Sequence, residues 1–244
     1  MQGGLGDIGG RRLELAAQLA AVFVRPLDVF DSHAGRLEPL TATETRAIAA
    51  HPAFRAPLNR AMASALQLAN TTLDEQQLAR LNTDGRLRCA VLLVSQPQQA
   101  LRQAATIVAA AVLHRRVLKI AFKAEIGRIR EVLGAEGFEI ATREAPLLHA
   151  ALGELDAAVD PAVFDAAVSA AEGQRRCLEF GLDILCRFVD GAVPALSDLM
   201  RFRCRSDLER QARGTVGKPL HAAHCDHIVK LIRRRMPSWS ATIG

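Results

Sequence analysis

Apolar residues recur at helical spacing along most of this chain, and prolines and glycines separate the repeats. The pattern predicts short helices over residues 12–24, 43–50, 57–69, 73–81, 87–94, 145–158 and 195–213. Two longer helices are predicted over residues 161–190 and, with one break, over residues 98–133. Runs of β-branched residues are short and do not alternate with polar residues, so no region is predicted to form a sheet.

Several residues predict where these helices begin and end. Pro52 is expected to end one helix, and Pro57 to start the next. Thr72 is predicted to cap the helix over residues 73–81, because Glu75 follows three residues later and completes a capping box. Gly134 and Gly137 are expected to form the turn after the longest apolar helix.

The nearly apolar stretch AATIVAAAVLHRRVLKIAF, residues 104–122, is predicted to form the centre of the core. The sequence shows no repeat at a solenoid period, and no Ser/Gly-rich linker divides it. We therefore predict an all-α fold: one multi-helix domain over residues 11–244, with long central helices and a semi-detached amphipathic C-terminal helix. Residues 1–10 are rich in glycine and are expected to form a flexible lead.

The C-terminal stretch LHAAHCDHIVKLIRRRMPSW, residues 220–239, is the most informative segment. Pro219 favours a helix start, and Pro237 cannot continue the helix. Its apolar residues fall on one face, namely Cys225, Ile228 and Ile232, with Leu231 beside them, whereas Lys230, Arg233 and Arg234 point elsewhere. The pattern predicts a short amphipathic helix with a cationic C-terminal end, where positive charge suits the helix dipole.

The positive charge of the chain is concentrated near this end. Residues 201–235 hold ten Lys or Arg against three Asp or Glu, a local charge of +7, which leaves −2 for the remainder because the total is +5. Such a segment could bind nucleic acid, an anionic membrane face or an acidic protein. A second basic stripe, His114-Arg115-Arg116 with Lys119 and Lys123, is expected to be a solvated helix face.

The cysteines and the apolar stretches of the chain indicate in which cellular compartment we expect it. The five cysteines are an odd number in a long chain, so reduced cytosolic thiols are expected. The apolar stretch over residues 13–24 is short and contains Glu14 and Gln18, which argues against a signal peptide. No apolar run approaches the length needed to span a bilayer.

One cluster contains residue types that bind metals: His221, His224, Cys225, Asp226 and His227. His221, His224 and Cys225 would share one face of a helix, as in some zinc sites, but His227 and Asp226 would point away and no partner motif is present. We therefore favour a core position for Cys225, with flanking histidines at a helix start, and predict no metal or other cofactor.

No arrangement typical of an active site is present. The glycines of the N-terminal lead match no phosphate-binding pattern, there is no GxSxG, and the carboxylates are dispersed. Cys204 lies among Arg201, Arg203 and Arg205, which would lower its pKa, although a solvated basic face is the favoured interpretation. We expect no catalytic residue and no enzymatic activity.

The segment HCDHIVKLIRRRMPS, residues 224–238, resembles the C-terminus of the SctK family of type III secretion proteins, also called YscK or NolU. Residues 91–122 are similar to the central helix pair of that family, including Leu113-His114, although Arg115 replaces the glycine expected there. Residues 180–191 resemble its later Gly-Leu helix.

The resemblance implies a cytoplasmic, non-enzymatic adaptor at the inner-membrane face of the secretion machine. Such adaptors belong to the sorting platform, where they link the forkhead-associated domain of the SctD-like ring protein to the SctQ-like pod protein and so, indirectly, to the secretion ATPase. The expected partner-binding residues are Lys230, Arg233, Arg234 and Trp239. Closure of the core by Ile228, Leu231 and Ile232 is the alternative role of this helix.

Two other function classes remain open at this point. One is a helical nucleic-acid-binding regulator that uses the basic C-terminal region. Specific nucleic-acid binding is not expected, because the sequence contains no helix-turn-helix signature or aromatic platform and only one tryptophan, Trp239. The other is a small helical enzyme whose activity would depend on His221 or His224.

Overall fold

The computed structural model describes residues 5–29, 40–65, 68, 73–81, 83–120, 123–158, 161–165, 167–204 and 218–244. Every regular element in these ranges is helical and none is a strand, which confirms the all-α prediction. Contacts between Cα atoms divide the chain into two compact units. Unit 1 comprises residues 1–101, 192–214 and 243, and unit 2 comprises residues 102–191, 215–242 and 244. The sequence carries no linker that would indicate this division.

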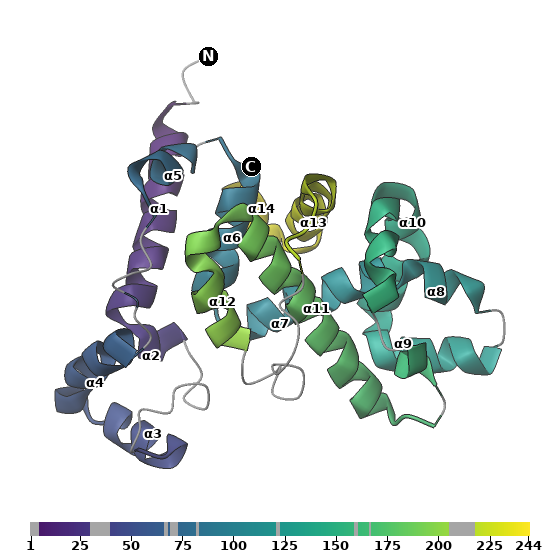
Figure 1. The fold of residues 1–244 in the computed structure, drawn as a ribbon, viewed down its shortest axis with the longest axis horizontal. Coiled ribbons are helices and arrows are strands. Elements are labelled where there is room, and N and C mark those ends of the chain that lie inside the picture. Colours follow the sequence, from purple (N-terminus) through teal and green to yellow (C-terminus); the bar gives the residue numbers. More distant parts are fainter. Residues whose placement is uncertain are drawn as a thin grey trace. The chain divides into compact units, whose positions relative to one another are not determined.

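Unit 1 begins with a helix that buries a regular apolar stripe. Helix α1 (Leu5–Val24) buries Leu15, Leu19 and Val22, which lie on one helical face, and packs against α6 (Gly85–Ser95) (Figure 1). The helix thus begins inside the stretch expected to be a flexible lead, of which residues 1–4 lie outside the described part. It ends before Pro26, as predicted, and α2 (Pro26–Val29) follows.

The next helices of unit 1 show which capping signals operate. Thr41 caps α3 (Ala42–Ala50) in a capping box with Glu44. Helix α4 (Pro52–Ala65) begins at Pro52 and contains Pro57, so the predicted helix start at Pro57 was wrong. Helix α5 (Glu75–Arg80) is capped by Asp74. Its capping box uses Gln77, so the prediction of Glu75 in that role was wrong by two residues; Thr72 lies outside the described residues.

A buried arginine connects the last helix of unit 1 in the described residues to α6. The short 3-10 helix η5 (Pro194–Leu196) and α12 (Ser197–Cys204) both contact α6. Arg203 is 1% exposed and donates hydrogen bonds to the carbonyl oxygens of Leu93, at 3.0 Å, and Gln96. These carbonyls belong to the last turn and C-cap of α6, where a cation is favourable. The prediction that this arginine lies on a solvated face was therefore wrong.

Unit 2 contains the apolar centre of the sequence, but not as one long helix. The stretch predicted over residues 98–133 forms α7 (Gln98–Val112), α8 (His114–Lys119) and the start of α9 (Lys123–Glu139). Gly134 adopts φ 71° and kinks α9 at the position where a turn was predicted. The helix predicted over residues 145–158 is divided into the π-helix η2 (Ile140–Glu144), α10 (Ala145–Leu148) and the 3-10 helix η3 (Ala150–Ala158).

The predicted solvated stripe on α8 is only partly solvated. His114 is buried, and its Nδ1 lies 2.8 Å from the carbonyl oxygen of Ala111. Arg116 reaches Asp156 of η3, with 2.5 Å between Nε and Oδ1. Arg115 and Lys119 are exposed. Helices α8, α9 and α10 each contact η2, so this end of the unit forms around the π-helix (teal in Figure 1).

The long helix α11 (Ala170–Ala192) crosses α7 at very short range (Figure 1). A Cβ atom at Gly181 would lie 2.0 Å from the carbonyl oxygen of Ala105, so only glycine fits there. Small residues on α7, Ala104 and Ala105, are completely buried. The alanine-rich sequence of α7 therefore permits a backbone approach that larger side chains would prevent. The short 3-10 helix η4 (Pro161–Phe164) precedes α11.

The C-terminal segment forms two helices in place of one. Helix α13 (Ala222–Arg235) buries the predicted apolar face, Cys225, Ile228, Leu231 and Ile232, and packs against η3. Met236 has non-helical dihedrals, and α14 (Pro237–Ile243) begins at Pro237. The amphipathic helix is thus confirmed, and its apolar residues close a core as the alternative interpretation predicted. The segment before it, residues 205–217, lies outside the described residues.

Candidate functional site

A buried carboxylate in unit 2 gathers the charged end of α13. The side chain of Glu144, the last residue of η2, is only 4% exposed. Arg235 Nε donates a hydrogen bond to Glu144 Oε2 at 2.5 Å, and Arg235 Nη2 pairs with the same oxygen. Arg234 Nε lies 3.2 Å from Glu144 Oε1. Consecutive arginines of α13 therefore hold one carboxylate from two sides.

The π-helix explains how the single guanidinium of Arg235 reaches two carboxylates. Arg235 Nη2 lies 3.3 Å from Glu139 Oε1 as well, and Glu139 and Glu144 are five positions apart. Side chains at that spacing diverge on an α-helix, whereas a π-turn, with its i→i+5 hydrogen bond, brings them closer together. The backbone N–H of Ala145 makes such a bond to Ile140. One guanidinium can therefore bind both carboxylates.

Two histidines extend the cluster on its other side. His149, the C-cap of α10, is 2% exposed, and its Nε2 lies 3.7 Å from Glu144 Oε1. Its Nδ1 lies 3.4 Å from Nδ1 of His227 on α13, with the two rings nearly perpendicular at 88°. Burial lowers the pKa of His149, the carboxylate of Glu144 opposes this shift, and His227 and Arg234 add to it.

We call these residues the α13 polar cluster: Glu139, Glu144, His149, His227, Arg234 and Arg235. The sequence indicated only its α13 members as notable. Glu139, Glu144 and His149 lie 78 to 96 positions before their partners on α13, and no motif links them to that helix. The π-turn that brings Glu139 and Glu144 together was not predicted either, because hydrophobic periodicity does not reveal such turns.

The four predicted partner-binding residues have different environments. Lys230, Arg233 and Arg234 are exposed, although Arg233 Nη1 also donates to the carbonyl oxygen of Gly244 at 2.5 Å and Arg234 pairs with Glu144. Trp239 is only 3% exposed and is a core residue of this conformation. Lys230, Arg233 and Arg234 form what we call the α13 cationic edge, and their binding to a partner stays a prediction.

The histidines and the cysteine at the start of α13 do not converge on one point. His221 is the N-cap and accepts a hydrogen bond from the backbone N–H of Ala223, whereas His224 Nε2 lies 3.2 Å from Glu154 Oε2. Cys225 lies in the core, as predicted. Among the residues that the structure describes, no group of three or more His, Cys, Asp or Glu is arranged to hold a metal ion.

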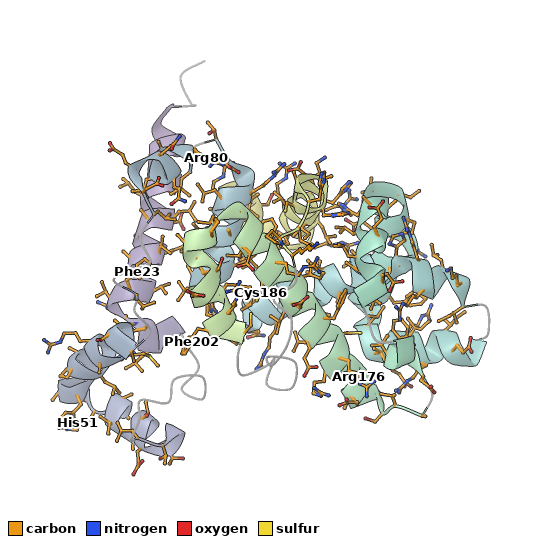
Figure 2. All side chains as sticks on the ribbon, viewed as in Figure 1. Phe23, His51, Arg80, Arg176, Cys186 and Phe202 are labelled. Carbon is orange, nitrogen blue, oxygen red and sulfur yellow. The ribbon has the colours of Figure 1, made fainter. Side chains whose placement is uncertain are left out.

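All five cysteines are buried and none forms a disulfide; Cys186 on α11 is labelled in Figure 2. Burial raises the pKa of the Cys177 thiol to about 12. Cys204 is completely buried beside Arg203, whose own pKa is lowered by burial to about 10. The interpretation of Cys204 as a residue on a solvated face was therefore wrong.

None of the helices in the described ranges is both long enough and apolar enough to cross a membrane. Comparisons with protein families, curated proteins and solved structures found no match to this chain.

Proposed function

We propose that this protein is a helical adaptor of a type III secretion system, which links the inner-membrane ring protein to the SctQ-like pod on the cytoplasmic side. The resemblance of residues 224–238 to the SctK family motivates the proposal. The observation that carries it is the α13 cationic edge, which lies on a helix anchored by four buried apolar residues. Because the backbone of this helix is already fixed, a partner need not pay to order it on binding, and this favours recognition of an acidic surface.

The α13 cationic edge also defines the variants that test the proposal. Arg234 has an internal partner, so reversing its charge would perturb the fold as well as the surface. The double variant Lys230→Glu/Arg233→Glu leaves the Arg234–Glu144 ion pair intact and removes only the hydrogen bond from Arg233 to the carbonyl oxygen of Gly244. Arg115→Glu/Lys119→Glu on α8 is the matched control, because it makes the same change in net charge at exposed positions of the same unit.

The measurement is binding of the purified protein to a SctQ-like pod protein and to the cytoplasmic domain of the SctD-like ring protein. We expect binding to at least one of them, and the α13 double variant should weaken it about tenfold or more, with little change in the control. Absence of binding to both proteins would refute the assignment. A nucleic-acid-binding regulator would instead bind duplex DNA, with an affinity that falls steeply as salt increases.

A further inference from the structure

The imidazoles of His149 and His227 are spaced as two ligands of one metal ion would be. Zinc binds histidine nitrogens at about 2.0–2.1 Å, and a tetrahedral angle then places two such nitrogens about 3.3–3.4 Å apart. The two Nδ1 atoms are 3.4 Å apart. The spacing of the two nitrogens therefore suits one ion that binds both.

The surroundings of His149 resemble the outer shell of metal-binding histidines. Such histidines commonly direct their second ring nitrogen toward a carboxylate, which fixes the tautomer and the ring orientation. The second nitrogen of His149, Nε2, is buried without a hydrogen bond, and the nearest carboxylate oxygen, Oε1 of Glu144, lies 3.7 Å away. Arg235 binds the other oxygen of Glu144, Oε2.

The charge and access of the site are compatible with a cation. The two carboxylates and two guanidinium groups of the α13 polar cluster balance, so its fixed charge is zero. His227 is only half-buried, so solvent reaches this side chain.

From this geometry we propose that His149 and His227 bind a divalent transition-metal ion of the zinc class through their Nδ1 atoms, with Glu144 as the positioning residue. This site is independent of the proposed adaptor function. The ion joins the C-terminal end of α10 to α13, so its binding stabilises the helix that carries the α13 cationic edge. Without metal, the same pair shares one proton in an N–H···N hydrogen bond.

Calorimetric titration of the chelator-treated full-length protein with Zn²⁺ at pH 7.5 tests the proposal, and Co²⁺ absorption reports the ligand geometry. We expect one ion per chain and an increase in melting temperature. His227→Gln, at a half-buried position, should weaken binding more than about tenfold, as should His149→Gln. The control His221→Gln/His224→Gln removes the other two histidines of this segment, whose ring centroids are 6.2 Å apart, and should bind Zn²⁺ like the parent.

Circular dichroism establishes that each variant is folded, and the His227→Gln result alone decides the matter if His149→Gln does not fold. The proposal is overturned if Zn²⁺ does not bind, if His227→Gln binds it as well as the parent, or if the His221/His224 control loses it equally.

Discussion

Replacing Arg235 should destabilise the protein much more than replacing Arg234, although both arginines bind Glu144. In Arg235→Met, a carboxylate that is 4% exposed loses the partner that occupies Oε2, and the remaining partner, Arg234, has a side chain that is 63% exposed. Removing one member of a buried ion pair costs about 3–5 kcal/mol, and the remaining Arg234 contact reduces the expected loss to about 2–4 kcal/mol. Arg234→Met removes a largely solvated pair and should cost about 0–1 kcal/mol.

Guanidinium chloride unfolding followed by circular dichroism gives both free energies of unfolding. The two variants make the same chemical change at adjacent positions of α13, so each is the control of the other. The double variant with Glu144→Gln completes a thermodynamic cycle that isolates the Arg235–Glu144 coupling. If Arg235→Met and Arg234→Met destabilise the protein equally, or if the coupling is near zero, Glu144 does not anchor α13 through Arg235.

Three further predictions concern the core of unit 2 and the thiols. Gly181→Ala should cost more than about 2 kcal/mol, because its Cβ meets the carbonyl oxygen of Ala105, whereas Gly127→Ala, with nothing within 4 Å, should stabilise by up to about 1 kcal/mol in thermal unfolding. Because the pKa of His149 is lowered, the folded state binds this proton less readily than the unfolded chain does. The contribution of His149 to stability is therefore complete above about pH 6.5 and is lost as the pH falls below that value. His149→Gln should reduce this pH dependence when the free energy of unfolding is measured from about pH 8 to about pH 5. The five cysteines should react with a thiol reagent only after denaturation, since all are buried; rapid reaction of the native protein would contradict their placement.

The sequence predicted the elements whose signals are local. The apolar stripe of α13, the end of α1 before Pro26 and the kink at Gly134 each depend on residues within one or two turns of the helix. Periodicity and the conformational limits of proline and glycine are sufficient for such features. The fold class followed for the same reason, because these signals recur along the whole chain.

Features that depend on distant residues were not predicted. Arg203 was expected on the surface by its residue type, yet the end of α6, more than 100 positions earlier, supplies carbonyl oxygens that compensate its burial. Glu144 and His149 are unremarkable in the sequence and become a cluster only when α13 packs nearby. A single sequence contains no signal for such pairings, since each half is chemically ordinary alone.

The π-turn at Ile140–Glu144 determines how the polar cluster responds to a change in chain length. A π-turn is equivalent to one surplus residue within an otherwise α-helical path. Deleting a residue there would restore a regular α-helix, in which Glu139 and Glu144 would be four positions apart and would still share a face. His149 and the residues after it would keep their orientation, whereas the same deletion in a regular helical turn would rotate everything after it by about 100°.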